Sequence, residues 1–136
     1  MMNAHLLIGE VAKRAGVSPD TVRHYERKGI LHGVRRDPSG YRRYDESAID
    51  RIRVVRRALG IGFTLDELAR IFRQRAAGKP PCRQVYELAA RKAAELDERI
   101  AAMTAVRAAL AETLASWEQK LQSTPQGDFA RLLEAL

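Results

Sequence analysis

Apolar residues in the first thirty positions recur every three or four residues, in two short runs separated by Gly16. This spacing is typical of two short helices joined by a tight turn. Gly16 permits the positive backbone angle that ends a helix, and Val17 is suited to pack under the corner. The apolar stripe of the first predicted helix consists of Ile8, Val11, Ala12 and Ala15.

The second predicted helix begins with residues that favour a helix start. Ser18 is a good N-cap, Pro19 suits the first helical position, and Asp20 complements the helix dipole. One face of this helix holds Val22, Tyr25 and Glu26, and the other holds Thr21, His24, Arg27 and Lys28. A short helix with a polar, basic outer face predicts a helix-turn-helix that enters the major groove, although an ordinary helical hairpin has the same pattern.

Two polar residues of the second helix have alternative roles. His24 is suited to read a base edge, but a lone exposed histidine is also common without any function. Asp20 would be repelled by phosphate. We therefore expect Asp20 to lie off the DNA backbone or to support a neighbouring arginine.

The helical pattern fails between Ile30 and Ser47, where the run "VRRDPSGYRRY" predicts two short strands around an Asp-Pro-Ser-Gly turn. Because side chains alternate along a strand, Tyr41 and Arg43 lie on one side of this hairpin, and Arg42 and Tyr44 on the other. Arginine forks and tyrosine hydroxyls are suited to phosphate oxygens. The hairpin is therefore a candidate DNA-binding wing, or else an edge hairpin kept soluble by its charges.

A second helix pair follows the hairpin. The first helix, Asp45 to Leu59, has an apolar stripe of Ile49, Ile52, Val55 and Leu59. Its arginines off that stripe are Arg53, Arg56 and Arg57. They are candidates for flanking phosphates or for a solvated helix face. The second helix begins at Thr64, which forms a predicted capping box with Glu67.

A long helix is predicted from Cys82 to Leu121, because this stretch contains no proline or glycine and would extend roughly 60 Å. Its apolar positions keep a 3-4 spacing in one heptad frame, broken only by Arg107: Tyr86, Ala89, Ala93, Leu96, Ile100, Met103, Leu110, Leu114, Trp117 and Leu121. Such a seam predicts a coiled-coil dimer, and the alternative is a helix that folds back onto its own domain. The tail at 122–136 has a loop and an apolar turn suited to fold over the helix ends.

The net charge of +7 is confined to the first half of the chain. Residues 1–75 hold 16 lysines and arginines against 9 acidic residues, whereas residues 76–136 hold 8 of each. A basic half joined to a neutral half predicts one part that meets a polyanion and another that meets protein or ligand. The single cysteine, Cys82, excludes an intramolecular disulfide framework. With no leader and no transmembrane run, we expect a cytoplasmic protein that does not meet a membrane.

The run "IGEVAKRAGVSPDTVRHYERKGIL" and the following "GYRRYDESAIDRIRVVRRALGIGFTLDELARIF" closely resemble the N-terminal domain of the MerR family of transcription regulators. The resemblance covers residues 8–72. It implies a winged helix-turn-helix with a second wing made by a helix pair, and an antiparallel homodimer. It also implies action with RNA polymerase at promoters with an overlong spacer.

The resemblance places DNA contacts on the recognition helix and on the wing. Those it implies are Thr21, Arg23, Tyr25, Tyr41, Arg42 and Arg43. Further candidates for DNA binding are Ser18, His24 and Arg35.

Metal-sensing members of the family hold their ion with a cysteine at the start of the dimer helix and cysteines of the C-terminal loop. Cys82 matches the first of these, but the loop has no cysteine. Because a soft metal needs two or more thiolates or imidazoles, the ligand set for a metal cofactor is incomplete, with Cys82 as its only candidate. A metal ion is thus possible only with an incomplete ligand set. Cys82 and Trp117 are therefore effector or sensor candidates. For Cys82 the alternatives are a redox or electrophile sensor thiol, a vestigial metal ligand or plain packing at the helix start, and for Trp117 the alternative is packing. In an antiparallel pair crossing near residues 100–103, Cys82 would approach Leu121 of the partner.

The sequence thus predicts a mostly α protein in three parts. These are a winged helix-turn-helix DNA-binding domain at 1–75, a linker and antiparallel coiled-coil helix at 76–121, and an effector loop with a short helix at 122–136. The predicted function is sequence-specific regulation of transcription by a homodimer that distorts a palindromic promoter element. A constitutive architectural DNA-binding protein without a ligand is the alternative. An enzyme is not expected, because the chain lacks a phosphate loop and a nucleophile with a histidine partner.

Overall fold

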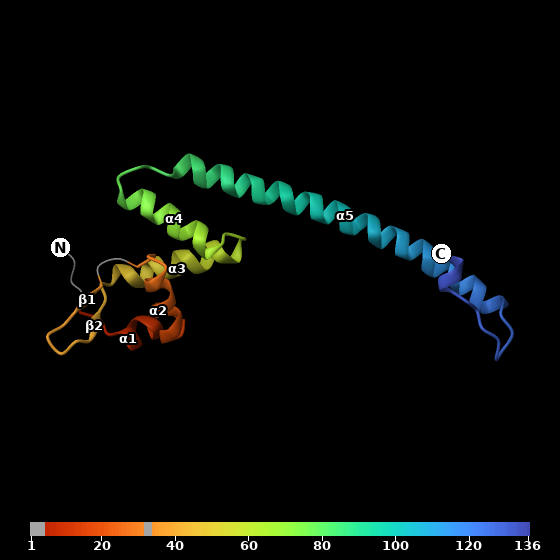
Figure 1. Ribbon diagram of the computed structural model, residues 1–136, viewed down its shortest axis with the longest axis horizontal. Coiled ribbons are helices and arrows are strands. Elements are labelled where there is room, and N and C mark those ends of the chain that lie inside the picture. Colours follow the sequence, from red (N-terminus) through yellow and green to blue (C-terminus); the bar gives the residue numbers. More distant parts are fainter. Residues whose placement is uncertain (1–4, 32–33) are drawn as a thin grey trace. The chain divides into compact units, whose positions relative to one another are not determined.

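The structure is a computed structural model that describes residues 5–31 and 34–136, and its described part is mostly helical (Figure 1). The elements in chain order are α1 (Ile8–Ala15), α2 (Pro19–Arg27), β1 (Arg35–Arg36), β2 (Arg42–Arg43), α3 (Ser47–Gly60), α4 (Leu65–Ala76), α5 (Cys82–Ser123) and the 3-10 helix η1 (Leu133–Ala135). The chain forms two compact units, Met1–Ala89 and Ala90–Leu136.

The helix-turn-helix of α1 and α2 follows the local signals of the sequence. Gly16 ends α1 in the left-handed region, with a φ of 73°. The hydroxyl of Ser18 accepts a hydrogen bond from the backbone N–H of Thr21, and Pro19 opens α2. The predicted N-cap of α2 is therefore confirmed.

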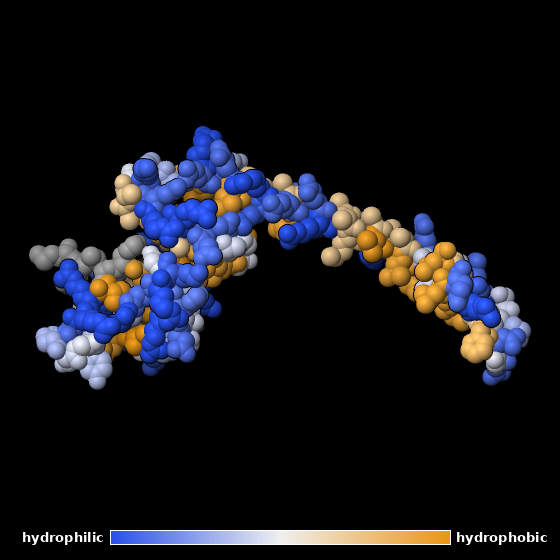
Figure 2. All heavy atoms as spheres, viewed as in Figure 1, coloured by the Kyte–Doolittle hydropathy of each residue, from blue (hydrophilic) through white to orange (hydrophobic). Residues whose placement is uncertain are grey.

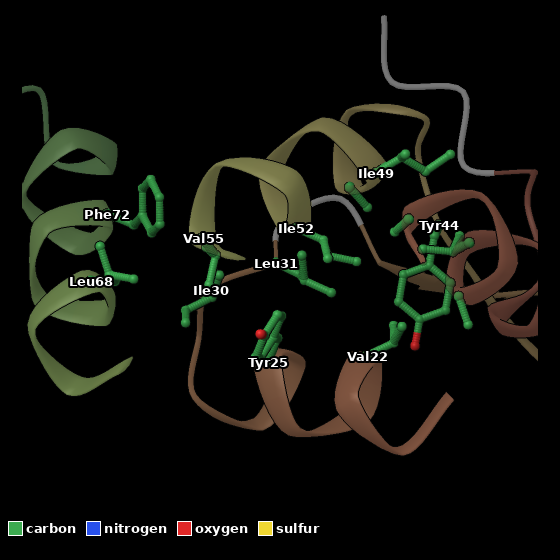
Figure 3. Packing of buried hydrophobic residues seen from close by; sticks show 14 of the residues in the cluster. Val22, Tyr25, Ile30, Leu31, Tyr44, Ile49, Ile52, Val55, Leu68 and Phe72 are labelled. Carbon is green, nitrogen blue, oxygen red and sulfur yellow. The ribbon is translucent and has the colours of Figure 1, made fainter. Parts of the chain in front are cut away.

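The core of the first unit gathers the inward faces of α1 to α4 around Ile30 and Tyr44, both fully buried. Figure 3 shows Val22 and Tyr25 of α2 on one side of this cluster and Ile52 of α3 on the other. The predicted capping box of α4 is present, since Thr64 and Glu67 each bond the other's backbone N–H. The local capping signals and the apolar stripes thus predict the same helices, as expected for a sequence whose local preferences match its fold.

The wing is an antiparallel hairpin in which Arg35 pairs with Arg43 and Arg36 with Arg42. Its turn is closed by a hydrogen bond of 2.9 Å from the N–H of Gly40 to the carbonyl of Asp37. Beyond the hairpin, Leu6 forms an isolated antiparallel bridge with Tyr44, which the sequence pattern did not predict. The segment before α1 is thereby joined to the base of the wing.

Asp37 holds the turn and the second strand of the wing together. Its Oδ1 accepts a 3.0 Å hydrogen bond from the N–H of Tyr41, and its Oδ2 accepts one of 3.0 Å from Nε of Arg43. Arg43 also donates from Nη1 to the carbonyl of His5, at 3.1 Å. Two wing residues are therefore tied to one carboxylate.

The helix α5 ends two residues later than predicted, at Ser123, and none of its residues is buried. Its first turns belong to the first unit, where Val85, Leu88 and Ala89 pack against the core. The three-part division with boundaries after residues 75 and 121 stays a prediction. No helix within residues 5–31 and 34–136 is long and apolar enough to cross a membrane.

The tail of the second unit returns to α5. Nζ of Lys120 donates a 3.3 Å hydrogen bond to the carbonyl of Arg131, and Leu136 lines a cavity together with Trp117. The tail therefore folds back over this helix end, although Phe129 of its apolar turn is 91% exposed.

The wing's stability is predicted to fall in acid. Burial by itself would raise the pKa of the Asp37 carboxyl, but hydrogen bonds from Arg43 and from the backbone of Tyr41 and Ser39 hold that pKa below its ordinary value. A carboxyl group whose pKa is lowered on folding stabilises the folded state at pH values above its ordinary pKa of about 3.9. This stabilisation is lost as the pH falls through the pKa of the folded state. In urea unfolding, the wild type should exceed Asp37→Asn in stability at pH 6, and the difference should shrink below about pH 4. A difference that stays constant over this range would contradict the role of the charge.

Candidate nucleic-acid interface

The outer face of α2 carries most of the residues predicted to read DNA. Arg23 and His24 are exposed, and Thr21 is half-buried. Nη1 of Arg23 lies 2.7 Å from Oδ1 of Asp20, so Asp20 supports a neighbouring arginine, as the sequence led us to expect. Oγ of Ser18 lies 3.0 Å from Oγ1 of Thr21, in addition to its capping bond. Both hydroxyls are therefore oriented at the start of the helix.

Tyr25 lies in the core rather than on the outer face of α2, with 6% of its surface exposed. Burial raises the pKa of its hydroxyl, and the positive charge of Arg56 offsets part of that rise. The Tyr25 ring therefore packs α2 against the core. The DNA contact that the family resemblance implied for Tyr25 stays a prediction, for a residue that the structure places in the core.

The wing presents two of its candidate residues freely. Tyr41 is 66% exposed, and Arg35 is exposed with no ion-pair partner among the described residues. Arg43 is held by Asp37 and the carbonyl of His5, as described above, and a third of its side chain remains exposed. The tip and the outer edge of the hairpin are thus open to a ligand, whereas Arg43 is fixed in place.

Arg42 reaches from the wing to the recognition helix. Its Nη1 forms an ion pair with Oε1 of Glu26, and the hydroxyl of Tyr44 donates a 2.9 Å hydrogen bond to Oε2 of the same carboxylate. Arg42 and Tyr44 therefore share one side of the hairpin, as the strand alternation predicted. Burial raises the pKa of the Tyr44 hydroxyl, and the charges of Arg42 and Arg23 lower it in part.

The sequence reasoning missed the position of Glu26 at this junction. The available signal was an acidic residue on the inward face of a helix whose outer face is basic. A carboxylate in that place requires a cationic or hydrogen-bonding partner from another element.

The arginines of α3 have a partly structural role. Nη2 of Arg53 donates a 3.1 Å hydrogen bond to the carbonyl of Arg14, and Nη1 of Arg56 donates one of 3.3 Å to the carbonyl of Gly16. Cations at the carbonyl end of a helix are favoured by the helix dipole. Arg53 and Arg56 therefore cap the end of α1, and together with Arg57 they line an open cavity of about 500 Å³.

The two effector candidates each line a cavity of their own. Cys82 is exposed and lines a cavity of about 550 Å³ with Arg83 and Tyr86. Trp117 lines one of about 240 Å³ with Thr113, Ser116 and Leu136, among other residues. Its buried Nε1 has no hydrogen-bond partner in the part of the chain that the structure describes.

A metal ion does not fit these residues. No group of three or more histidine, cysteine, aspartate or glutamate side chains is gathered anywhere in the described residues. A single thiolate per chain falls short of the ligand sets that hold soft metals. The described residues of one chain therefore do not form the metal site that the resemblance implied for metal-sensing members.

Two family sequence models match the chain. "MerR HTH family regulatory protein" matches residues 6–75, and "MerR, DNA binding" matches residues 49–113. Together they cover the helix-turn-helix, the wing, the α3–α4 pair and much of α5.

Similar proteins agree with these matches. A mercuric resistance operon regulatory protein from Pseudomonas fluorescens is 36% identical over 108 residues, covering 79% of this chain and 74% of that protein. One from Bacillus cereus is 32% identical, covering 68% and 70%.

Solved structures show the same fold. The lead(II) complex of the transcription regulator PbrR691 from Ralstonia metallidurans CH34 matches with a TM-score of 0.69 and 27% identity, covering 96% of this chain and 99% of that one. A MerR-family regulator lacking the sensor domain, bound to promoter DNA, matches with a TM-score of 0.55 and 22% identity, covering 86% and 92%. This chain therefore belongs to the MerR family of helix-turn-helix transcription regulators, which bind DNA and are not enzymes.

Proposed function

We propose that this regulator acts as a homodimer that binds a palindromic promoter element and distorts the DNA between its half-sites. The observation that carries the proposal is the uncovered apolar seam of α5. Leu96, Ile100, Met103, Leu110 and Leu114 keep the heptad spacing, and each is at least 50% exposed. On the face seen in Figure 2, apolar side chains gather along the part of this helix that belongs to the second unit.

A second copy of the chain is the partner that fits this seam. A single helix of this length gains little stability from its backbone alone, and an apolar heptad stripe is covered in coiled coils by an identical stripe. The family resemblance supports an antiparallel pair. Two DNA-binding units would then be held at a fixed separation, which matches a palindrome with a fixed spacing of half-sites.

The DNA-binding surface is proposed to combine the outer face of α2 with the wing. Thr21, Arg23 and His24 are placed to reach base edges or phosphates from the helix, and Arg35 and Tyr41 from the hairpin. Wings that hold phosphates on both sides can bend or untwist the DNA between them. At a promoter with an overlong spacer, such distortion would realign the elements that RNA polymerase recognises.

Effector input is proposed at the ends of the dimer helix, where Cys82 and Trp117 are the candidate residues. An effector shifts the balance between distorting and undistorting states only by its difference in affinity for the two. The donor set argues for an effector other than a soft metal ion, even though the similar PbrR691 was solved with lead(II). The cavity of about 240 Å³ beside Trp117 lies next to the helix end where this input is proposed.

The dimer is tested by placing a charge in the seam. Ile100→Glu should convert the protein from a dimer to a monomer at micromolar concentration, because two buried carboxylates would face the partner's apolar stripe. Ala105→Glu, one turn further along and on the side of the helix away from the seam, is the matched control and should leave the dimer intact. Sedimentation velocity measures both. A wild-type monomer, or an Ile100→Glu dimer, would overturn the proposed assembly.

The wing's contact with phosphate is tested by salt dependence. Arg35→Ala should weaken binding to all duplexes and reduce the slope of log affinity against log salt by about one, because one phosphate contact is lost. Arg91→Ala removes a charge from the second unit and should leave the slope unchanged.

The wild type should prefer a selected palindrome over random duplex by about a thousandfold or more. Equal affinity for both duplexes would instead indicate an architectural protein.

The absence of a metal function is tested with Zn²⁺. Because one thiolate cannot complete a tetrahedral site, the melting temperature and the fluorescence of Trp117, the chain's one tryptophan, should respond alike in the wild type and in Cys82→Ser. A saturable Zn²⁺ response that disappears in Cys82→Ser would restore a metal site at the helix start.

A further inference from the structure

The contact between wing and recognition helix depends on one carboxylate. Glu26 stands near the end of α2, and only 16% of its side chain is exposed. Each of its oxygens has its own partner from the wing, Arg42 on Oε1 and the hydroxyl of Tyr44 on Oε2. Tyr44 itself is fully buried and its backbone is bonded to Leu6, so this partner is fixed.

We propose that Glu26 is a positioning residue for DNA recognition, which locks the wing to the recognition helix so that the two contact DNA as one rigid unit. A partly buried carboxylate with two charge-assisted or hydroxyl hydrogen bonds holds a narrow geometry. Removing Arg42 would leave the carboxylate without a compensating charge, and removing the Tyr44 hydroxyl would leave one carboxylate oxygen without its hydrogen bond. The wing therefore cannot shift along DNA without moving α2.

This arrangement changes the expected role of Arg42. The family resemblance implied a DNA contact for this residue, and the sequence suggested a grip on phosphate. In the structure its charge is compensated by Glu26, although 42% of its side chain stays exposed. Arg42 therefore contributes to affinity chiefly by its place in the junction, and less as a free positive charge.

The negative charge of the Glu26 carboxylate also affects how strongly the protein prefers a specific DNA site over other duplexes. A negative charge near the DNA-facing surface lowers the affinity for any duplex, because that affinity is set by phosphate neutralisation. The same charge favours the one geometry in which wing and helix are both engaged. Glu26 should thus lower non-specific binding while raising specific binding. This inference rests on DNA binding by the family and not on the proposed dimer.

Glu26→Gln tests the proposal, because glutamine keeps the shape and an acceptor oxygen but removes the charge. The probes are a duplex selected by the wild-type protein from a random-sequence pool and a shuffled duplex of equal length. Affinity for the selected duplex should fall about tenfold, whereas affinity for the shuffled duplex should rise about twofold. A purely structural role would lower both affinities together, and that result would overturn the proposal.

Glu10→Gln is the matched control. Glu10 is exposed on α1, and Nη1 of Arg14 lies 3.9 Å from its Oε1. The same loss of charge at this position should change both affinities in the same direction and leave their ratio unaltered. A fall in the ratio equal to that of Glu26→Gln would show a general charge effect and refute the positioning role.

A double-mutant cycle tests the coupling of Glu26 and Arg42 directly, with each affinity corrected for the folded fraction of the variant. Arg42→Ala alone should reduce affinity for the selected duplex, and Glu26→Gln combined with Arg42→Ala should lose about as much as either change alone. Thermal melting followed by circular dichroism measures the folded fraction of each variant. Additive losses in affinity among the folded variants would show that the two residues act independently, contrary to the proposal.

Discussion

The burial of Tyr44 is the constraint on which the DNA-binding unit depends. Its ring lies fully buried among the helices, its backbone pairs with Leu6, and its hydroxyl reaches Glu26. One residue at the end of the hairpin thereby joins the chain's start, the wing and the recognition helix. A two-stranded hairpin is marginal on its own in water, so this anchoring is what allows a two-residue strand pair to serve as a wing.

The long helix α5 differs from the DNA-binding unit because most of its apolar residues are exposed. A small first unit already has a core of its own, and only the first turns of α5 pack against it, through Val85, Leu88 and Ala89. Most apolar positions in the rest of the helix are exposed, and Trp117 is half-buried beside the tail. In the proposed function a second copy of the chain covers this stripe, which is why assembly and DNA spacing are linked there.

The features that the sequence predicted correctly are those set by near neighbours. Ser18 and Thr64 cap helices with partners three residues away, and Gly16 and Gly40 turn the chain at positive φ. The unpredicted contacts join residues 18 to 41 positions apart, such as Tyr44 with Glu26 and the α3 arginines with the end of α1. Periodicity assigns a side chain to a face, but the element that meets this face depends on tertiary packing. Tyr25 is an example. The helical periodicity placed it on the same face as Val22, whereas the family resemblance implied that it contacts DNA.

Net charge overstates the positive charge that is free to meet DNA. Arg23, Arg42 and Arg43 are each paired with a carboxylate, and two arginines of α3 cap the end of α1. Within the described residues, the arginines of the first half without a partner include Arg27, Arg35 and Arg57. Paired arginines still donate hydrogen bonds in fixed directions, which serves recognition of a particular geometry more than attraction to any polyanion. The internal pairing of the basic half is therefore consistent with a regulator that selects its site, because attraction without geometry would hold it equally well to all DNA.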